Sequence, residues 1–163
     1  MRLLLSLLIA ATVLVACDQQ RIGKLEEGLS TEAEVRQQFG TPAQTTERAD
    51  GSKLLEYPRQ PEGSTNYEII IGADGKLASL RQLLTPTNFA KVVTGMEQAE
   101  VRRTLGKPAT SQTYALKPEE TVWAWRFLDG QQKKEFSVTF DRELRVASSA
   151  TADDLRESMA GGK

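Results

Sequence analysis

The sequence predicts an α+β fold built from two tandem ααβββ(β) repeats, each with a helix pair packed on one face of a small antiparallel sheet. An eleven-residue pattern occurs at 33–43 and again at 99–109, with seven positions identical. After each copy, apolar residues change from helical spacing to the period of two that is typical of half-buried strands. Because a sheet with one apolar face must be covered, the preceding helices are the available cover.

The helix of the first copy carries both a start and a stop signal. Thr31 and Glu34 have the spacing of a capping box. Gly40 stands where a left-handed residue would end the helix, and Pro42 prevents the helix from resuming. Val35, inside the helix, lies on its apolar face.

The second copy repeats the stop signal but not the start. Gly106 and Pro108 match the glycine and proline of the first copy, whereas Glu97 stands where a hydroxyl or an aspartate is expected. A shorter amphipathic piece precedes each helix, at 21–27 and 88–94, and completes the predicted helix pair.

Alternating aromatic residues predict the strands that follow the second helix. One face of these strands would be apolar and buried, with polar residues between. The residues of this face are Trp123, Trp125, Phe127, Phe136, Val138 and Phe140. We interpret them as core, although aromatic residues left exposed would be partner anchors.

The first residues have the pattern of a secretory signal. Arg2 is followed by an apolar run over 3–15, which is shorter than a bilayer-spanning helix requires. The run ends Leu14-Val15-Ala16-Cys17, which resembles the lipobox of bacterial lipoproteins. That resemblance implies a cut before Cys17, a diacylglyceryl group on its thiol and an acyl chain such as palmitate on the new amine. The alternative is an ordinary signal peptide with an incidental cysteine.

These patterns divide the chain into four predicted segments. Residues 1–16 are the lipoprotein signal peptide, 17–86 the first repeat, 87–152 the second repeat and 153–163 a C-terminal tail. The repeats resemble the small outer-membrane assembly lipoproteins of the BamE (SmpA/OmlA) family. The stretches that carry this resemblance are Gly95-Met96, Leu105-Gly106-Lys107-Pro108, Trp123-Ala124-Trp125 and Val138-Thr139-Phe140-Asp141, with their counterparts in the first copy.

The resemblance implies a two-layer domain facing the periplasm and a non-enzymatic role in supporting the machine that inserts β-barrel proteins. Family members carry one such domain, whereas this chain carries two, an arrangement similar to that of secreted β-lactamase inhibitor proteins. Asp18 directly follows Cys17 and resembles an inner-membrane retention signal. We therefore expect a membrane-anchored lipoprotein, with the outer membrane modestly preferred and the inner membrane an alternative.

The composition excludes several kinds of chemistry. The chain has no histidine and one cysteine, so it holds no Ser-His-Asp set, no Cys-His pair and no histidine-ligated zinc. A formal net charge of −1 gives no basic surface for nucleic acid. We expect no enzyme activity, no cofactor, no metal and no small-molecule substrate.

Weaker candidates for a site remain in the loops. Ser111 with Lys117 could form a Ser-Lys pair, and Glu119 with Glu120 an acid–base pair, but we prefer to interpret both as solvated turns. The proline-stiffened loop 57–63 is a better candidate for recognition, and its Tyr57 and Arg59 are the predicted partner contacts. The alternative, which we favour for this loop, is a long hairpin connection without a binding role.

The leading hypothesis is a lipid-anchored module that binds another envelope protein, such as a component of the barrel-assembly machine. The alternatives are a tandem-domain inhibitor or holder of a periplasmic enzyme, an envelope hydrolase that uses carboxylates, and a structural spacer.

Overall fold

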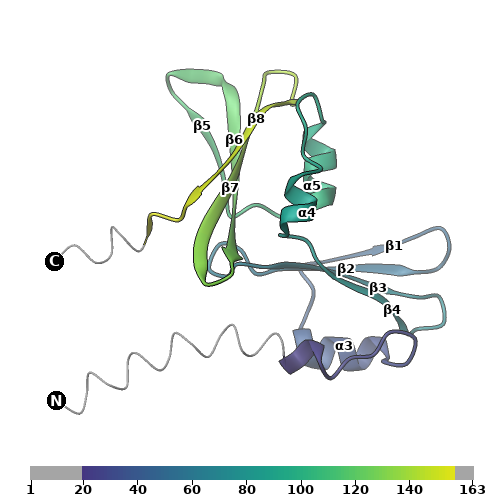
Figure 1. Cartoon of the computed structure of the whole chain (residues 1–163). Helices are drawn as coiled ribbons and strands as arrows, with labels where there is room; N and C mark the ends of the chain where they lie inside the picture. Colours follow the sequence, from purple (N-terminus) through teal and green to yellow (C-terminus); the bar gives the residue numbers. More distant parts are fainter. Residues whose placement is uncertain (1–19, 157–163) are drawn as a thin grey trace, which may run out of the picture. The chain divides into compact units, whose positions relative to one another are not determined.

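The structure is a computed structural model that describes residues 20–156. It is mostly β, with two four-stranded antiparallel sheets (Figure 1). The first sheet has the order β1-β2-β3-β4 and the second β5-β6-β7-β8. The strands of the two sheets are β1 (Gln44–Glu47), β2 (Lys53–Pro58), β3 (Asn66–Ile71), β4 (Leu77–Gln82), β5 (Thr110–Tyr114), β6 (Lys117–Asp129), β7 (Gln132–Phe140) and β8 (Val146–Asp153). The helices are α3 (Glu32–Phe39), α4 (Pro86–Phe89) and α5 (Gln98–Leu105).

Internal contacts divide the chain into two compact units, which we describe separately. The first unit holds the described residues up to Leu55 together with Ile69–Leu80. The second holds Glu56–Glu68, which is the end of the β2–β3 hairpin, and the described residues from Arg81 onward.

The predicted α+β fold with a helix pair on each sheet is wrong. The segment 21–27 is helical only as far as Ile22, and of the helix predicted over 88–94 only Asn88 and Phe89 are helical, as the last two residues of α4. A short helix is only marginally stable, because the first turn is costly to form and each further residue adds only one hydrogen bond. The chain between the expected helices bonds to a sheet edge instead: Gly28 N–H donates to Leu77 O at 2.8 Å, and Leu77 N–H donates to Ser30 O at 2.7 Å.

The predicted start and stop of the first helix are confirmed. Thr31 N–H donates to the Glu34 carboxylate at 2.7 Å, and Glu34 N–H donates to Thr31 Oγ1 at 3.3 Å. Gly40 ends the helix at φ 83°. In the second copy, the bond from Glu97 N–H to the Glu100 carboxylate is longer, at 3.4 Å, as expected for the less well specified start.

The aromatic face of the second sheet forms the core of the second unit, as the alternation predicts. Trp125, Phe127, Phe136 and Phe140 are buried, and Trp123 is partly buried against them. Phe89 of α4 stacks on Phe136 with ring centroids 4.4 Å apart. Valine and leucine side chains of α5 complete this core: Val101 and Leu105 are both 0% exposed.

A small charge network joins α3 to β2 in the first unit, and it predicts a pH dependence. The Glu32 carboxylate lies 2.8 Å from Arg36 Nη2 and 2.9 Å from Lys53 Nζ. The hydrogen bond from Lys53, followed by that from Arg36, lowers the pKa of Glu32 below its ordinary 4.5.

The lowered pKa of Glu32 predicts a pH dependence of stability. A carboxyl group with a lowered pKa stabilises the fold above its unfolded-state pKa, and this contribution is lost as the pH falls toward the folded-state value. Glu32→Gln should therefore make the unfolding free energy fall less steeply below pH 4.5, as measured by urea denaturation at a series of pH values. An equally steep fall in the native chain and in the variant would contradict this contribution.

Several predictions concern the ends of the chain. The signal peptide 1–16, Cys17, Asp18 and the last seven residues of the predicted tail lie outside the described residues. Within residues 20–156, no helix has the length and apolar character needed to cross a bilayer.

Candidate partner-binding surface

The turn between β7 and β8 is the structural counterpart of the turn between β3 and β4. In the first copy, Gly75 N–H donates to Gly72 O at 2.9 Å, and Gly75 O accepts from Glu32 N–H at 3.1 Å. In the second copy, Leu144 N–H donates to Asp141 O at 3.0 Å, and Leu144 O accepts from Gln98 N–H at 2.9 Å. The two turns therefore have the same hydrogen bonds, and leucine replaces glycine at one position.

That replacement puts a side chain where the backbone disfavours one. Gly75 has φ 78° and Leu144 has φ 57°; among the described residues, Leu144 is the one non-glycine residue with a positive φ. The left-handed region costs an L-residue roughly 1–2 kcal/mol because Cβ approaches the following carbonyl oxygen. The Leu144 side chain is also 50% exposed, so burial in the core does not compensate for this cost.

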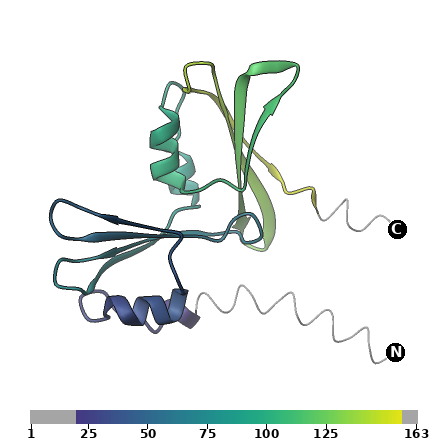
Figure 2. The ribbon, with the colours of Figure 1, turned by 180° about the vertical axis from the view of Figure 1, so that it is seen from behind.

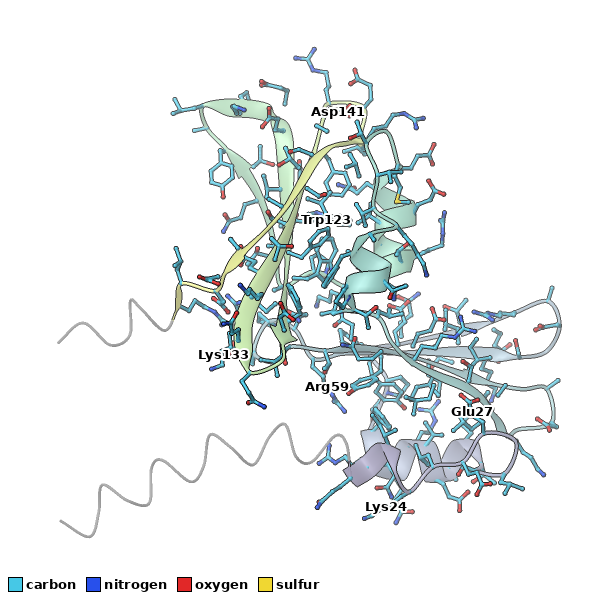
Figure 3. The ribbon with its side chains drawn as sticks, in the orientation of Figure 1. Lys24, Glu27, Arg59, Trp123, Lys133 and Asp141 are labelled. Carbon is cyan, nitrogen blue, oxygen red and sulfur yellow. The ribbon has the colours of Figure 1, made fainter. Side chains whose placement is uncertain are left out.

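Leu144 borders a depression between its own turn and the first residues of β6. Figure 3 shows Asp141 beside the turn between β7 and β8, at one end of the second unit. The depression has a volume of about 360 Å³ and is open to solvent; its lining residues are Pro118, Glu119, Thr121, Asp141, Arg142 and Leu144. Asp141 Oδ1 accepts the Arg145 backbone N–H at 2.8 Å, so this carboxylate holds the turn.

Exposed apolar side chains also lie at the β5–β6 turn. Leu116 at that turn is 96% exposed, and Tyr114 just before it is 53% exposed. Figures 1 and 2 show the β5–β6 turn and the β7–β8 turn at the same end of the second unit. We name this set, Tyr114, Leu116, Pro118 and Leu144, the apolar rim. Exposed apolar side chains that gather at one end of a domain are a candidate protein-binding site.

The two predicted contact residues lie elsewhere, in the end of the β2–β3 hairpin. Tyr57 is 2% exposed, so its ring belongs to the core and is not presented to a partner. Arg59 is half-buried, and its backbone N–H donates to Thr65 O at 3.0 Å (Figure 3). Both residues therefore make contacts within their own unit.

Two buried amides in this hairpin end were missed by the sequence reasoning. Gln60 Nε2 donates to Arg126 O at 2.8 Å, and its Oε1 accepts Arg126 N–H at 3.2 Å. Asn66 Nδ2 donates to Leu105 O at 2.8 Å and to Lys107 O at 2.9 Å, where α5 ends. Isolated amides in a polar loop carry no sequence signal for such contacts.

The weaker catalytic candidates are not assembled. Ser111 Oγ accepts Trp123 Nε1–H at 2.9 Å, while Lys117 Nζ bonds Glu120 at 3.0 Å, so the proposed Ser-Lys pair does not form. Glu120 is engaged by that lysine, whereas Glu119 lines the open depression. Among residues 20–156, no group of three acidic or cysteine side chains has the arrangement of a metal site.

Removing the Leu144 side chain should stabilise the protein. Leu144→Gly relieves the left-handed strain, partly offset by the greater freedom of glycine in the unfolded chain, so a gain of about 1 kcal/mol is expected. Glu143→Gly, one residue earlier and without a positive φ, should give no gain. Urea denaturation would compare the two variants, and a loss of stability in Leu144→Gly would contradict the assigned strain.

No family model and no curated protein matches the chain. Among solved structures, a DUF4309 family protein (YjgB) from Bacillus subtilis subsp. subtilis str. 168 matches with 16% identity and a TM-score of 0.30, over 80% of this chain and 82% of that one. An extracellular protein containing a SCP domain from Bacillus anthracis str. Ames matches with 10% identity and the same TM-score, over 80% of this chain and 45% of that one. Likeness at this level assigns neither a family nor a function to the chain.

Proposed function

We propose that the protein is a lipid-anchored, non-enzymatic module of the cell envelope that binds another envelope protein through the apolar rim. The observation that carries the proposal is Leu144, an exposed leucine in a left-handed conformation where the first copy has glycine. A residue that lowers stability and is not buried is best explained by a contact made outside its own unit.

The chemistry of the rim fits a protein partner. Tyrosine is enriched at protein interfaces, and the nearly complete exposure of Leu116 leaves its whole side chain available for burial. Glu119, Asp141 and Arg142 surround the depression and supply a polar border. The depression is shallow and open, which favours an inserted partner side chain over an enclosed small molecule.

The lipid anchor in this proposal rests on the lipobox that ends at Cys17. Several acyl chains, at about 0.8 kcal/mol for each buried methylene, hold a protein on a bilayer durably. Leu25 is eight residues from Cys17, a span of at most about 28 Å in an extended chain. The first unit would therefore stay close to the membrane. The repeats' resemblance to the BamE (SmpA/OmlA) family supports a component of the β-barrel assembly machine as the partner, with the outer membrane preferred and the inner membrane possible because of Asp18.

Cys17→Ser should abolish lipid attachment and release the protein from membranes. Without a thiol, no thioether to diacylglycerol can form, and incorporation of labelled palmitate should cease. The measurement is membrane fractionation of cells that carry the native chain or the variant. A variant that sediments with membranes as completely as the native chain would remove the anchor from the proposal.

The role in assembly is tested by complementation of a deletion strain. The double variant Leu116→Ser, Leu144→Gly should fold, with the strain at position 144 removed, yet fail to restore the level of inserted β-barrel proteins. Leu29→Ser is the matched control, because Leu29 is also an exposed leucine, at 60%, but lies in the first unit. Full restoration by the double variant would contradict the proposed role of the rim.

A further inference from the structure

Strand β8 leaves one edge of the second sheet open. It is last in the order β5-β6-β7-β8, and every residue after Val146 is exposed. From Val146 to Ala152 it holds no charged residue and no proline. Such residues are the usual means by which proteins prevent edge strands from pairing with another chain.

The ladder fixes which backbone groups face outward. Asp154 N–H donates to Lys133 O at 3.0 Å, and the pairing between residues 148 and 153 is regular. Because antiparallel ladders alternate, every second residue of β8 directs its N–H and C=O away from β7. These residues are Ser149, Thr151 and Asp153. Among residues 20–156, neither Ser149 nor Thr151 makes a backbone bond beyond the β7 ladder.

The equivalent edge of the first sheet is protected at one of the corresponding positions. The matching turns place Leu144 opposite Gly75, an offset of 69 residues, and the same offset places Ser149 opposite Leu80. The Leu80 N–H donates to the Glu27 carboxylate at 2.9 Å. The next residue of β4 is the charged Arg81, whose counterpart in β8 is Ala150. In the second copy Thr94 stands at the position of Glu27, and it has a shorter side chain and no carboxylate. The edge protection of one copy is therefore lost in the other.

We propose that β8 pairs antiparallel with β8 of a second copy of this chain, with Thr151 on the two-fold axis. This register pairs all three outward-facing residues: Thr151 with itself, and Ser149 with Asp153 in both directions. Each such pair exchanges two backbone hydrogen bonds. The two sheets then continue into each other across the dimer.

The side chains make this edge self-complementary. Ser149, Thr151 and Asp153 share one face of the strand, so each hydroxyl of Ser149 meets the Asp153 carboxylate of the second copy and can donate to it. Asp153 already bonds Lys134 at 2.9 Å, which neutralises its charge at the junction. No like charges face each other, and the small side chains allow the backbones to approach.

Cysteine placed on the two-fold axis tests this register in the full chain on its own membrane. Paired residues that exchange hydrogen bonds have Cα atoms about 5.5 Å apart, within the range of a disulfide. Thr151→Cys should therefore form a disulfide-linked dimer on mild oxidation. Ala147→Cys is the control: it lies four residues from the axis, so two copies would be roughly 27 Å apart and should not link. Its behaviour also reports any dimer formed through Cys17.

A second variant tests the backbone pairing without a new thiol. Thr151→Pro removes an outward N–H and no bond to β7, so the sheet should persist by circular dichroism. The native chain in mild detergent should sediment as a dimer, and Thr151→Pro as a monomer. A monomeric native chain, a dimeric Thr151→Pro variant, equal linking at positions 147 and 151, or a Thr151→Cys product joined only to a different protein would each overturn the proposal.

Discussion

Trp125→Ala should lower the free energy of unfolding of the second unit by about 3–5 kcal/mol, the usual cost of truncating a buried tryptophan. Trp125 is 0% exposed at the centre of the aromatic core. Its indole Nε1–H donates to Gly106 O at 3.1 Å and so satisfies a carbonyl at the end of α5. The substitution would remove both the packed ring and this buried hydrogen bond. Urea denaturation followed by tryptophan fluorescence and circular dichroism measures the effect.

Trp123→Ala is the matched control. Trp123 lies on the same strand and the same face, with its ring centroid 6.0 Å from that of Trp125, but it is only partly buried. Its indole N–H bonds the exposed Ser111 hydroxyl, which water can replace. The loss should therefore be clearly smaller. Equal losses in the two variants would mean that the core is not centred on Trp125.

Gly106→Ala should destabilise the protein more than Gly40→Ala, although both glycines end equivalent helices. Their backbone angles, φ 74° and ψ −166° at Gly106 and φ 83° and ψ −156° at Gly40, belong to a region that is almost restricted to glycine, so they impose a similar strain of about 1–3 kcal/mol on any added side chain. A Cβ at Gly40 meets nothing within 4 Å. At Gly106 it would lie 3.0 Å from Asn66 Nδ2 and 3.2 Å from Leu83 Cδ1.

Asn66 cannot easily move away, because its Nδ2 is held by two carbonyl oxygens at the end of α5. Overpacking of this kind costs about 1–3 kcal/mol, so Gly106→Ala should exceed Gly40→Ala by that amount. Gly40→Ala is the control for Gly106→Ala, because both variants replace a helix-ending glycine with alanine in the same protein, and their free energies of unfolding can be compared directly. Indistinguishable values would show that the Asn66 contact yields without cost.

The parts of the fold that local chemistry determines were predictable. The capping box at Thr31 and the helix ends at Gly40 and Gly106 depend on neighbours within a few residues, and they are found at the predicted positions. Both glycines have a positive φ, although their ψ angles, −156° and −166°, differ from those of a left-handed helical cap. The buried face of β6 follows from period-two alternation. The helix pairs failed because segments near Gly28 and Gly95 bond to the strands β4 and β8, and a bond to a distant strand leaves no periodic signal.

The candidate surface was harder to predict than the core. Proline and aromatic residues drew attention to loop 57–63, but Tyr57 is buried. The sequence did contain a signal for the rim: the offset of 69 that aligns the strands places Leu144 opposite Gly75. A glycine in one repeat that becomes leucine in the other marks a turn where the side chain is kept against local preference.

The strained turn and the unprotected strand edge both belong to the second copy. It has a leucine at the strained turn position, and it lacks the Glu27 carboxylate that protects the β4 edge in the first copy. The first copy retains the residues that make a protected, unstrained unit. This division of roles between two copies of one pattern is what we expect when one copy carries the binding surfaces.

Photo-crosslinking from position 116 in living cells tests the central proposal most directly. A photoreactive amino acid replacing Leu116 should link the protein to a component of the β-barrel assembly machine, and Leu144→Gly in the same chain should weaken this product while raising stability. The same probe replacing Leu29 should give no such product. An unchanged product in the Leu144→Gly background, or no linked assembly component from position 116, would contradict the account.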